Sequence, residues 1–87
     1  MKIKKGFVLR EVAGSYVVVA VGNAVKTFNG IINLNETGAF LWKQVEKGCD
    51  VEGLTQAILS EYEIEEGIAR SDAQKFMDKL TEAGLVE

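Results

Sequence analysis

The pattern of apolar residues along the chain changes its period once, within residues 31–42. Before this stretch, apolar residues alternate or form short runs, which is typical of β-strands. After it, they recur every three or four positions, which is typical of amphipathic helices. Leu34 closes the last strand, and Asn35 is a suitable N-cap because its side-chain oxygen can accept a hydrogen bond from a free helix N–H. The pattern therefore predicts a small sheet followed by helices.

A tight hairpin is predicted for the first two strands. The β-rich segment Phe7–Val12 and the apolar segment Tyr16–Val21 flank Ala13-Gly14-Ser15, whose residue types favour a short turn. The second segment is almost continuously apolar, which indicates cover on both of its faces.

The third predicted strand is the short segment Ile31–Leu34. It follows an ambiguous stretch, Ala24–Phe28, and the turn or bulge signal Asn29-Gly30. The simplest topology is a three-stranded antiparallel meander with this strand at an edge. Such an edge carries unpaired backbone donors and acceptors, so it needs a partner or a cover.

Two helices are predicted directly after the sheet. The first is expected from Glu36 to Lys47, with Gly48 as its C-terminal stop. Asp50 is the expected N-cap of the second helix. The apolar face of the second helix consists of Val51, Leu54, Ala57, Ile58 and Tyr62.

The third helix is expected to begin at Glu65 or Glu66 and to run to Ala83. The residues Leu85-Val86 beyond it are expected to fold back onto the core. The whole chain, residues 1–87, is therefore predicted to be a single α+β domain. Its three-stranded antiparallel sheet followed by three helices resembles a winged-helix arrangement.

Composition is that of a globular protein with one modest core. Hydrophobic residues make up 47% of the chain and charged residues 26%. No apolar run approaches the roughly 20 residues that span a bilayer. The basic N-terminal residues are not followed by a long apolar segment, so no secretion signal is predicted and a cytoplasmic location is expected.

The chemistry of the side chains argues against an enzyme. The chain has no histidine and a single cysteine, Cys49. An intrachain disulfide is impossible, the usual general base at neutral pH is missing, and a zinc site would need an unusual shell of carboxylates. Cys49 has no activating neighbour in the sequence, and we interpret it as a small residue between two helices. No catalytic residue, cofactor or metal is therefore predicted.

Charge is distributed unevenly between the two halves. Residues 1–49 have a net charge of +4 and residues 50–87 a net charge of −7. Most of these charges are expected to lie on solvated helix faces. The acidic helical half is a poor surface for nucleic acid, because phosphate neutralisation needs clustered Lys and Arg.

The combined pattern resembles the coenzyme PQQ synthesis protein D family (PqqD-like proteins). The most specific signature is Leu34-Asn35-Glu36-Thr37-Gly38-Ala39 with Trp42 eight residues after Leu34. Phe28-Asn29-Gly30 before it and the closing run from Leu80 to Val86 also fit. The resemblance covers residues 6–87.

The resemblance implies a non-catalytic peptide-recognition domain. Proteins similar to this one bind the leader segment of a ribosomally made precursor peptide and present its core to a maturation enzyme, often a radical SAM enzyme. In that family the leader docks as an extra strand against the third strand, in a groove bordered by the last helix. The free edge inferred from the pattern lies at the same strand, where main-chain bonds supply affinity and alternate side-chain pockets supply specificity.

Carried over to this chain, the resemblance implies a peptide-binding site on the third strand and the third helix. Only some of the strand side chains can face the groove, because neighbours alternate. Lys75 and Lys79 lie one turn apart and are expected to meet acidic leader residues. The Asn35–Gly38 segment is interpreted as structural, because capping and close packing explain it. The predicted site residues are Gly30, Ile31, Ile32, Asn33, Leu34, Ala69, Asp72, Ala73, Lys75, Phe76 and Lys79.

Two other functions remain open at this point. A winged-helix DNA-binding protein would contact DNA through Arg70, Lys75 and Lys79. The same helix region also carries five acidic residues that would repel the phosphates: Glu65, Glu66, Asp72, Asp78 and Glu82. A scaffold subunit would pair its edge strand with a second copy and form a homodimer.

Overall fold

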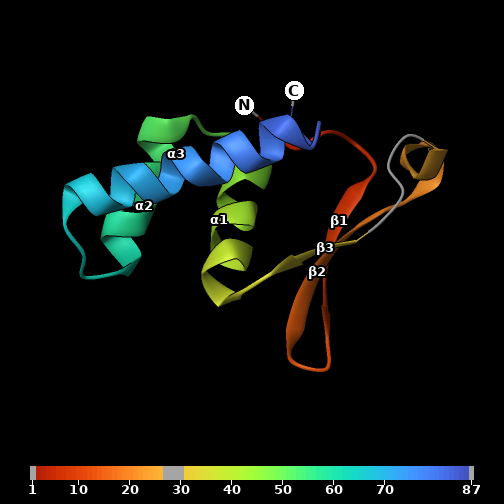
Figure 1. The fold of residues 1–87 in the computed structure, drawn as a ribbon, viewed down its shortest axis with the longest axis horizontal. Helices are drawn as coiled ribbons and strands as arrows, with labels where there is room; N and C mark the ends of the chain where they lie inside the picture. The colour runs from red at the N-terminus through yellow and green to blue at the C-terminus, as the bar shows by residue number, and fades with distance from the viewer. Residues whose placement is uncertain (1, 27–30, 87) are drawn as a thin grey trace.

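The computed structural model describes residues 2–26 and 31–86, with a sheet at one end and three helices at the other (Figure 1). The α+β class and the three-stranded antiparallel sheet followed by three helices are confirmed. The predicted turn at Asn29-Gly30 lies outside the described residues. The elements are β1 (Phe7–Val12), β2 (Ser15–Ala20), the 3-10 helix η1 (Gly22–Lys26), β3 (Ile31–Leu34), α1 (Glu36–Glu46), α2 (Val51–Glu61) and α3 (Glu66–Glu82).

The β1–β2 hairpin closes on a two-residue turn. Val12 pairs with Ser15, and the two residues between them have positive φ angles, 51° at Ala13 and 81° at Gly14. Positive φ at both central positions is typical of the type I′ turn, whose twist matches that of the flanking strands. Ser15 therefore belongs to β2, which begins and ends one residue earlier than the sequence predicted.

Only one face of the sheet packs against the helices. Val18 on the central strand is opposite Leu9 on β1 and Ile32 on β3, and its side chain is completely buried. The side chains of the neighbouring paired residues, Val8, Val19 and Ile31, point to the opposite face of the sheet, where Ile31 is 62% exposed. The sequence predicted that both faces of β2 are covered. The helices cover only the face of Val18, and Val19 on the outer face is half-buried.

Both predicted N-caps are present. The side chain of Asn35 accepts a hydrogen bond from Gly38 N at 2.7 Å, and that of Asp50 accepts one from Gly53 N at 2.8 Å. Each bond satisfies an amide that has no partner within its helix. The predicted stop after α1 is also confirmed, because Gly48 has a φ of +88°, which favours glycine.

The C-terminal residues return to the core as predicted. The side chain of Leu85 is completely buried, and its carbonyl oxygen accepts a hydrogen bond from Lys4 N at 2.8 Å. Ile3 and Val86 form an antiparallel bridge beside it. The described residues near the two ends of the chain therefore lie side by side at the C-terminal end of α3 (Figure 1).

Candidate functional site

The junction between β3 and α1 is fixed by close packing. Leu34 ends β3 and is 9% exposed, while Asn35 caps α1. A Cβ atom on Gly38 would lie 3.2 Å from both Leu34 Cβ and the capping oxygen of Asn35. Glycine at this position therefore lets the first turn of α1 approach the end of the strand. The predicted capping and close packing of the Asn35–Gly38 segment are confirmed.

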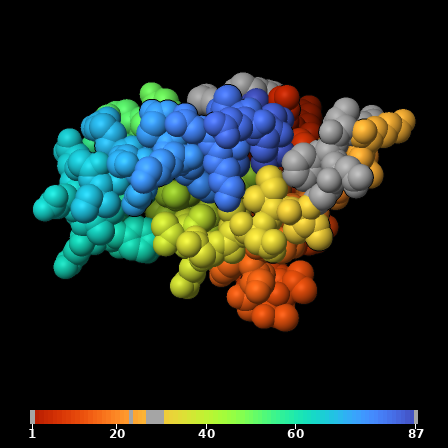
Figure 2. Space-filling view, in the orientation of Figure 1, coloured from red at the N-terminus to blue at the C-terminus, as the bar shows by residue number. Residues whose placement is uncertain are grey.

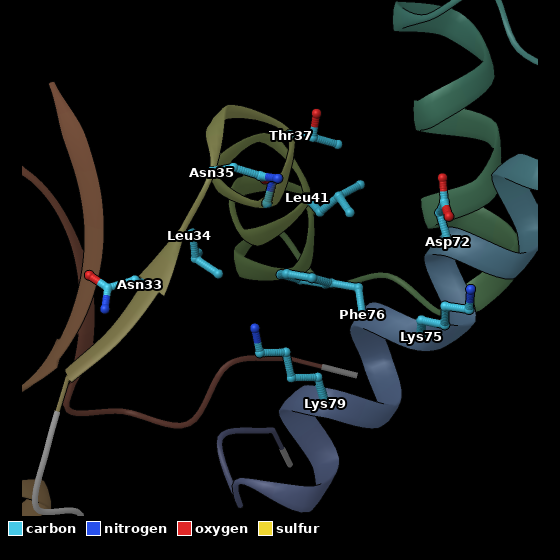
Figure 3. A pocket seen from close by; sticks show the side chains of 10 residues that line it. Asn33, Leu34, Asn35, Thr37, Leu41, Asp72, Lys75, Phe76 and Lys79 are labelled. Atoms are coloured by element: carbon cyan, nitrogen blue, oxygen red, sulfur yellow. The ribbon is translucent and has the colours of Figure 1, made fainter.

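A cavity of about 430 Å³ lies between this junction and α3. β3 and the start of α1 lie directly below α3 on one face of the molecule, yellow below blue in Figure 2. The floor is apolar, with Leu34 9%, Leu41 4% and Phe76 8% exposed. Phe76 projects from α3 toward β3 and α1 (Figure 3).

Polar residues border this apolar floor. Lys79 extends from α3 toward β3, near Leu34, whereas Lys75 and Asp72 lie on the side of the cavity away from β3 (Figure 3). The cavity therefore offers one lysine close to the strand. The remaining polar lining residues are Asn33, Asn35 and Thr37.

The free edge of β3 lies beside the cavity. β3 pairs with β2 alone in the sheet order β1-β2-β3, so its other edge has no strand partner among the described residues. Ile32 and Leu34 share the core face with Val18, whereas Asn33 points away from α3 (Figure 3). The core face of β3 is thus the face that borders the cavity, a question that the sequence left open.

The structure brings most of the predicted site residues together. Six of them line the cavity: Asn33, Leu34, Asp72, Lys75, Phe76 and Lys79. Ile31 and Ile32 are on the same strand, and Gly30 lies outside the described residues. Ala69 and Ala73 have no exposed surface and belong to the hydrophobic core. Their small size therefore allows close packing of α3 and leaves no surface for a ligand in this conformation.

The sequence did not predict that α1 contributes a wall. Thr37, Gly38 and Leu41 line the cavity together with the capping residue Asn35. Capping and packing fully explain the local motif, so the motif gave no sign of this second role. The spacing of Gly38 and Leu41 on one helical face was visible, but it is equally typical of a core contact.

The charged groups of α3 fall into two sets. Arg70 donates to Glu52 of α2 and forms an ion pair with Glu66 at 3.5 Å. The hydrogen bond from Arg70 holds the pKa of the Glu52 carboxyl below its usual value, with a further contribution from Gln56. Arg70 is therefore engaged away from the cavity. Lys75 and Lys79 form no ion pair within the described residues.

Metal binding and catalysis by a cysteine thiol find no support in the part of the chain that the structure describes. No group of three or more His, Cys, Asp or Glu there could hold a metal ion. Cys49 is half-buried, and burial raises the pKa of its thiol, which disfavours the nucleophilic thiolate. Among these residues, no helix has the length and apolar character needed to cross a membrane.

The described residues form a small α+β fold in which the edge of β3 without a strand partner lies beside a partly apolar groove. The model of the family described as coenzyme PQQ synthesis protein D (PqqD) matches residues 8–86, and the chain belongs to this family. The resemblance identified from the sequence is thus confirmed.

Two solved structures share the fold. The first, described as TbiB1 in complex with the TbiA(beta) leader peptide, is 23% identical with a TM-score of 0.78, and the match covers 100% of this chain and 95% of that one. The second, lasso peptide synthetase B1 complexed with the leader peptide, is 21% identical with a TM-score of 0.76, covering 99% and 95%. No match was found among curated proteins.

Proposed function

We propose that this chain is a non-catalytic peptide-recognition domain. It binds the leader segment of a ribosomally synthesised precursor peptide along the free edge of β3 and presents the peptide to a maturation enzyme. The observation that carries this proposal is the position of that edge, directly beside the cavity. The two structural neighbours are complexes with leader peptides, which supports a leader as the ligand class.

Strand addition accounts for both affinity and selectivity. The exposed N–H and C=O groups of β3 can pair with a peptide backbone of any sequence, and each net hydrogen bond contributes roughly 1 kcal/mol. Side chains of an added strand alternate between the two faces. Every second peptide residue would therefore enter the cavity above Leu34, Leu41 and Phe76, where an apolar side chain fits.

The lysines add a preference for acidic leader residues. Lys79 extends toward β3, so it is the closer partner for a peptide carboxylate, and Lys75 is farther along α3 near Asp72 (Figure 3). Lys79→Glu should weaken binding of a leader with an acidic residue on the cavity side. Replacing that acidic residue by Lys should restore binding to Lys79→Glu. An equal loss with Lys75→Glu, without rescue, would contradict this assignment.

Backbone methylation of the peptide tests strand addition. A bound strand turns alternate N–H groups toward its partner, so N-methylation at every second residue should block binding to β3. Methylation at the intervening residues should have a much smaller effect, and these peptides serve as matched controls. Calorimetric titration with each methylated leader measures the pattern. Uniform effects at all positions would contradict an added strand.

The domain has no catalytic role in this proposal. The region 1–87 acts as one recognition unit in the cytoplasm, where precursor peptides are made, and its enzyme partner is a radical SAM enzyme. A homodimer that pairs two β3 edges is the competing use of the same surface. Mass measurement over a range of concentrations detects such a dimer. Excess leader should dissociate it, because the leader and the second copy of the chain would bind the same edge of β3.

A further inference from the structure

A second cavity, of about 380 Å³, lies on the other side of the first turns of α1. Thr37, Gly38 and Leu41 of α1 line the groove already described, whereas Glu36, Phe40 and Lys43 line this second cavity. The two cavities also share one rung of the sheet. Tyr16 of β2 lines the second cavity and is paired with Leu34 of β3, which lines the first.

Aromatic rings are concentrated at this second cavity. Both tyrosines of the chain, Tyr16 and Tyr62, line it together with Phe40. The rings of Phe40 and Tyr62 are perpendicular, with their centroids 5.7 Å apart. All three side chains are half-buried, so part of each remains accessible to a ligand. Aromatic faces carry negative electrostatic potential and attract cations.

The charges of the cavity also favour a cation. Glu36 and Glu61 line it, and Glu61 is the last residue of α2. The C-terminal end of a helix carries partial negative charge, and α2 has no basic residue in its last turn to offset it. Glu36 in turn opposes the positive end of α1, where it occupies the first turn. Glu63 and Glu65, which follow α2, are exposed and add negative charge to the chain beyond Tyr62.

Lys43 is the one basic residue among those that line this cavity. Within the described residues it forms no ion pair with Glu36 or Glu61. Its side chain is exposed and remains free to move into solvent. The positive charge of Lys43 would repel an incoming cation, so removal of that charge should favour the cation.

We infer that this second cavity is a docking site for an arginine side chain on a partner protein. A guanidinium stacks on aromatic faces and donates two parallel hydrogen bonds to a carboxylate, and the cavity offers both kinds of group. Arginine and aromatic residues are also enriched at the centres of protein interfaces. Because α1 separates the two cavities, a partner docked here leaves the β3 edge free. The inference does not rest on leader binding.

Short blocked peptides test the ligand class on the full chain. The probes are acetyl-Gly-Arg-Gly-amide and its neutral analogue with citrulline in place of arginine. The arginine peptide should cause saturable NMR shifts of the Tyr16, Phe40 and Tyr62 ring protons. The citrulline peptide should bind about tenfold more weakly, because it lacks the charge. Equal binding of both peptides, or no saturable ring shift, would overturn the inference.

Three variants separate this site from general surface charge. Glu36→Gln with Glu61→Gln should weaken arginine binding at least several-fold, whereas Lys43→Gln should strengthen it. Glu46→Gln, an exposed α1 position outside the cavity, is the matched control and should leave it unchanged. If Lys43→Gln weakens binding, or if acetyl-Gly-Glu-Gly-amide binds more tightly than the arginine peptide, the cavity takes an anion instead.

A further probe distinguishes a protein side chain from a free small cation. Ethylguanidinium carries the same charged group without peptide bonds and should bind more weakly than the arginine peptide. Equal affinity would assign the cavity to a small cation and overturn the protein partner. Lys43→Gln should leave leader affinity unchanged, so the outcome is independent of the β3 groove.

Discussion

Replacement of Gly38 by alanine tests the packing that brings β3 to the groove. In a helix, Gly→Ala normally stabilises by up to about 1 kcal/mol, because alanine loses less backbone entropy on folding. At Gly38 the new Cβ would lie 3.2 Å from Leu34 Cβ and 3.3 Å from Leu34 Cδ2. It would also lie 3.2 Å from the capping oxygen of Asn35. Overpacking of this kind costs roughly 1–3 kcal/mol.

Gly67 provides the matched control for this substitution. It lies in the first turn of α3, and an added Cβ would meet nothing within 4 Å. Gly67→Ala should therefore stabilise the fold, whereas at Gly38 the crowding should cancel the stabilisation by alanine. The expected difference in free energy of unfolding between the two variants is about 1–3 kcal/mol.

Urea denaturation followed by circular dichroism measures this difference. For a domain of this size, each kcal/mol also shifts the melting temperature by roughly 4–8 °C. Gly38→Ala should in addition weaken leader binding, because the displaced Leu34 forms part of the cavity floor. If Gly38→Ala is as stable as Gly67→Ala, the strand–helix junction is not closely packed and the reasoning is refuted.

Four further substitutions test other parts of the fold. Gly6→Ala should destabilise by about 2–4 kcal/mol, because Gly6 has a φ of +98° and the new Cβ would lie 2.7 Å from Ala24 Cβ. Gly14→Ala is the control, because Gly14 also has a positive φ but a new Cβ there would meet nothing within 4 Å. It should cost only about 1–2 kcal/mol in urea denaturation. Equal losses for Gly6→Ala and Gly14→Ala would contradict the close contact between Gly6 and Ala24. Asn35→Ala should cost about 1 kcal/mol through the lost cap, with an unchanged urea midpoint as the contrary result. Glu52→Gln should reduce stability slightly at pH 7 and progressively less as the pH is lowered below 4.5. The Glu52 pKa is lowered on folding, so its contribution is present above the ordinary value of 4.5 and is lost as pH falls through the folded value. Because this ion pair is exposed, the loss of stability should shrink in high salt, and a larger loss at acid pH than at pH 7 would contradict the sign.

Local signals in the sequence predicted most of the fold. Asn35, Asp50 and Gly48 are residue types with one dominant role at a helix end, so the helix limits could be predicted to within a residue. The exposure of the outer sheet face could not be predicted in the same way. An apolar run such as Tyr16–Val21 does not reveal which neighbours the chain later places on each face.

The groove itself depends on contacts between distant segments. Phe76 and Lys79 could be assigned to it because the resemblance to the PqqD-like family implies a groove between the third strand and the last helix. Ala73 could not be separated from Phe76 by periodicity, since both lie on the buried side of α3, but only Phe76 of the two lines the cavity. The cavity beside Tyr16 and Tyr62 joins β2 to the end of α2, and no local pattern links these positions.

NMR titration with candidate leaders tests the central claim most directly. Isotope-labelled protein would be titrated with synthetic leader segments of small precursor peptides encoded beside its gene. Saturable amide shifts concentrated in residues 31–35 and 72–79 are the predicted result, because strand addition changes the hydrogen bonding of β3 and the surroundings of the facing side of α3. Saturable shifts confined to other elements, or no shifts with any of these leaders, would contradict leader binding at the β3 edge.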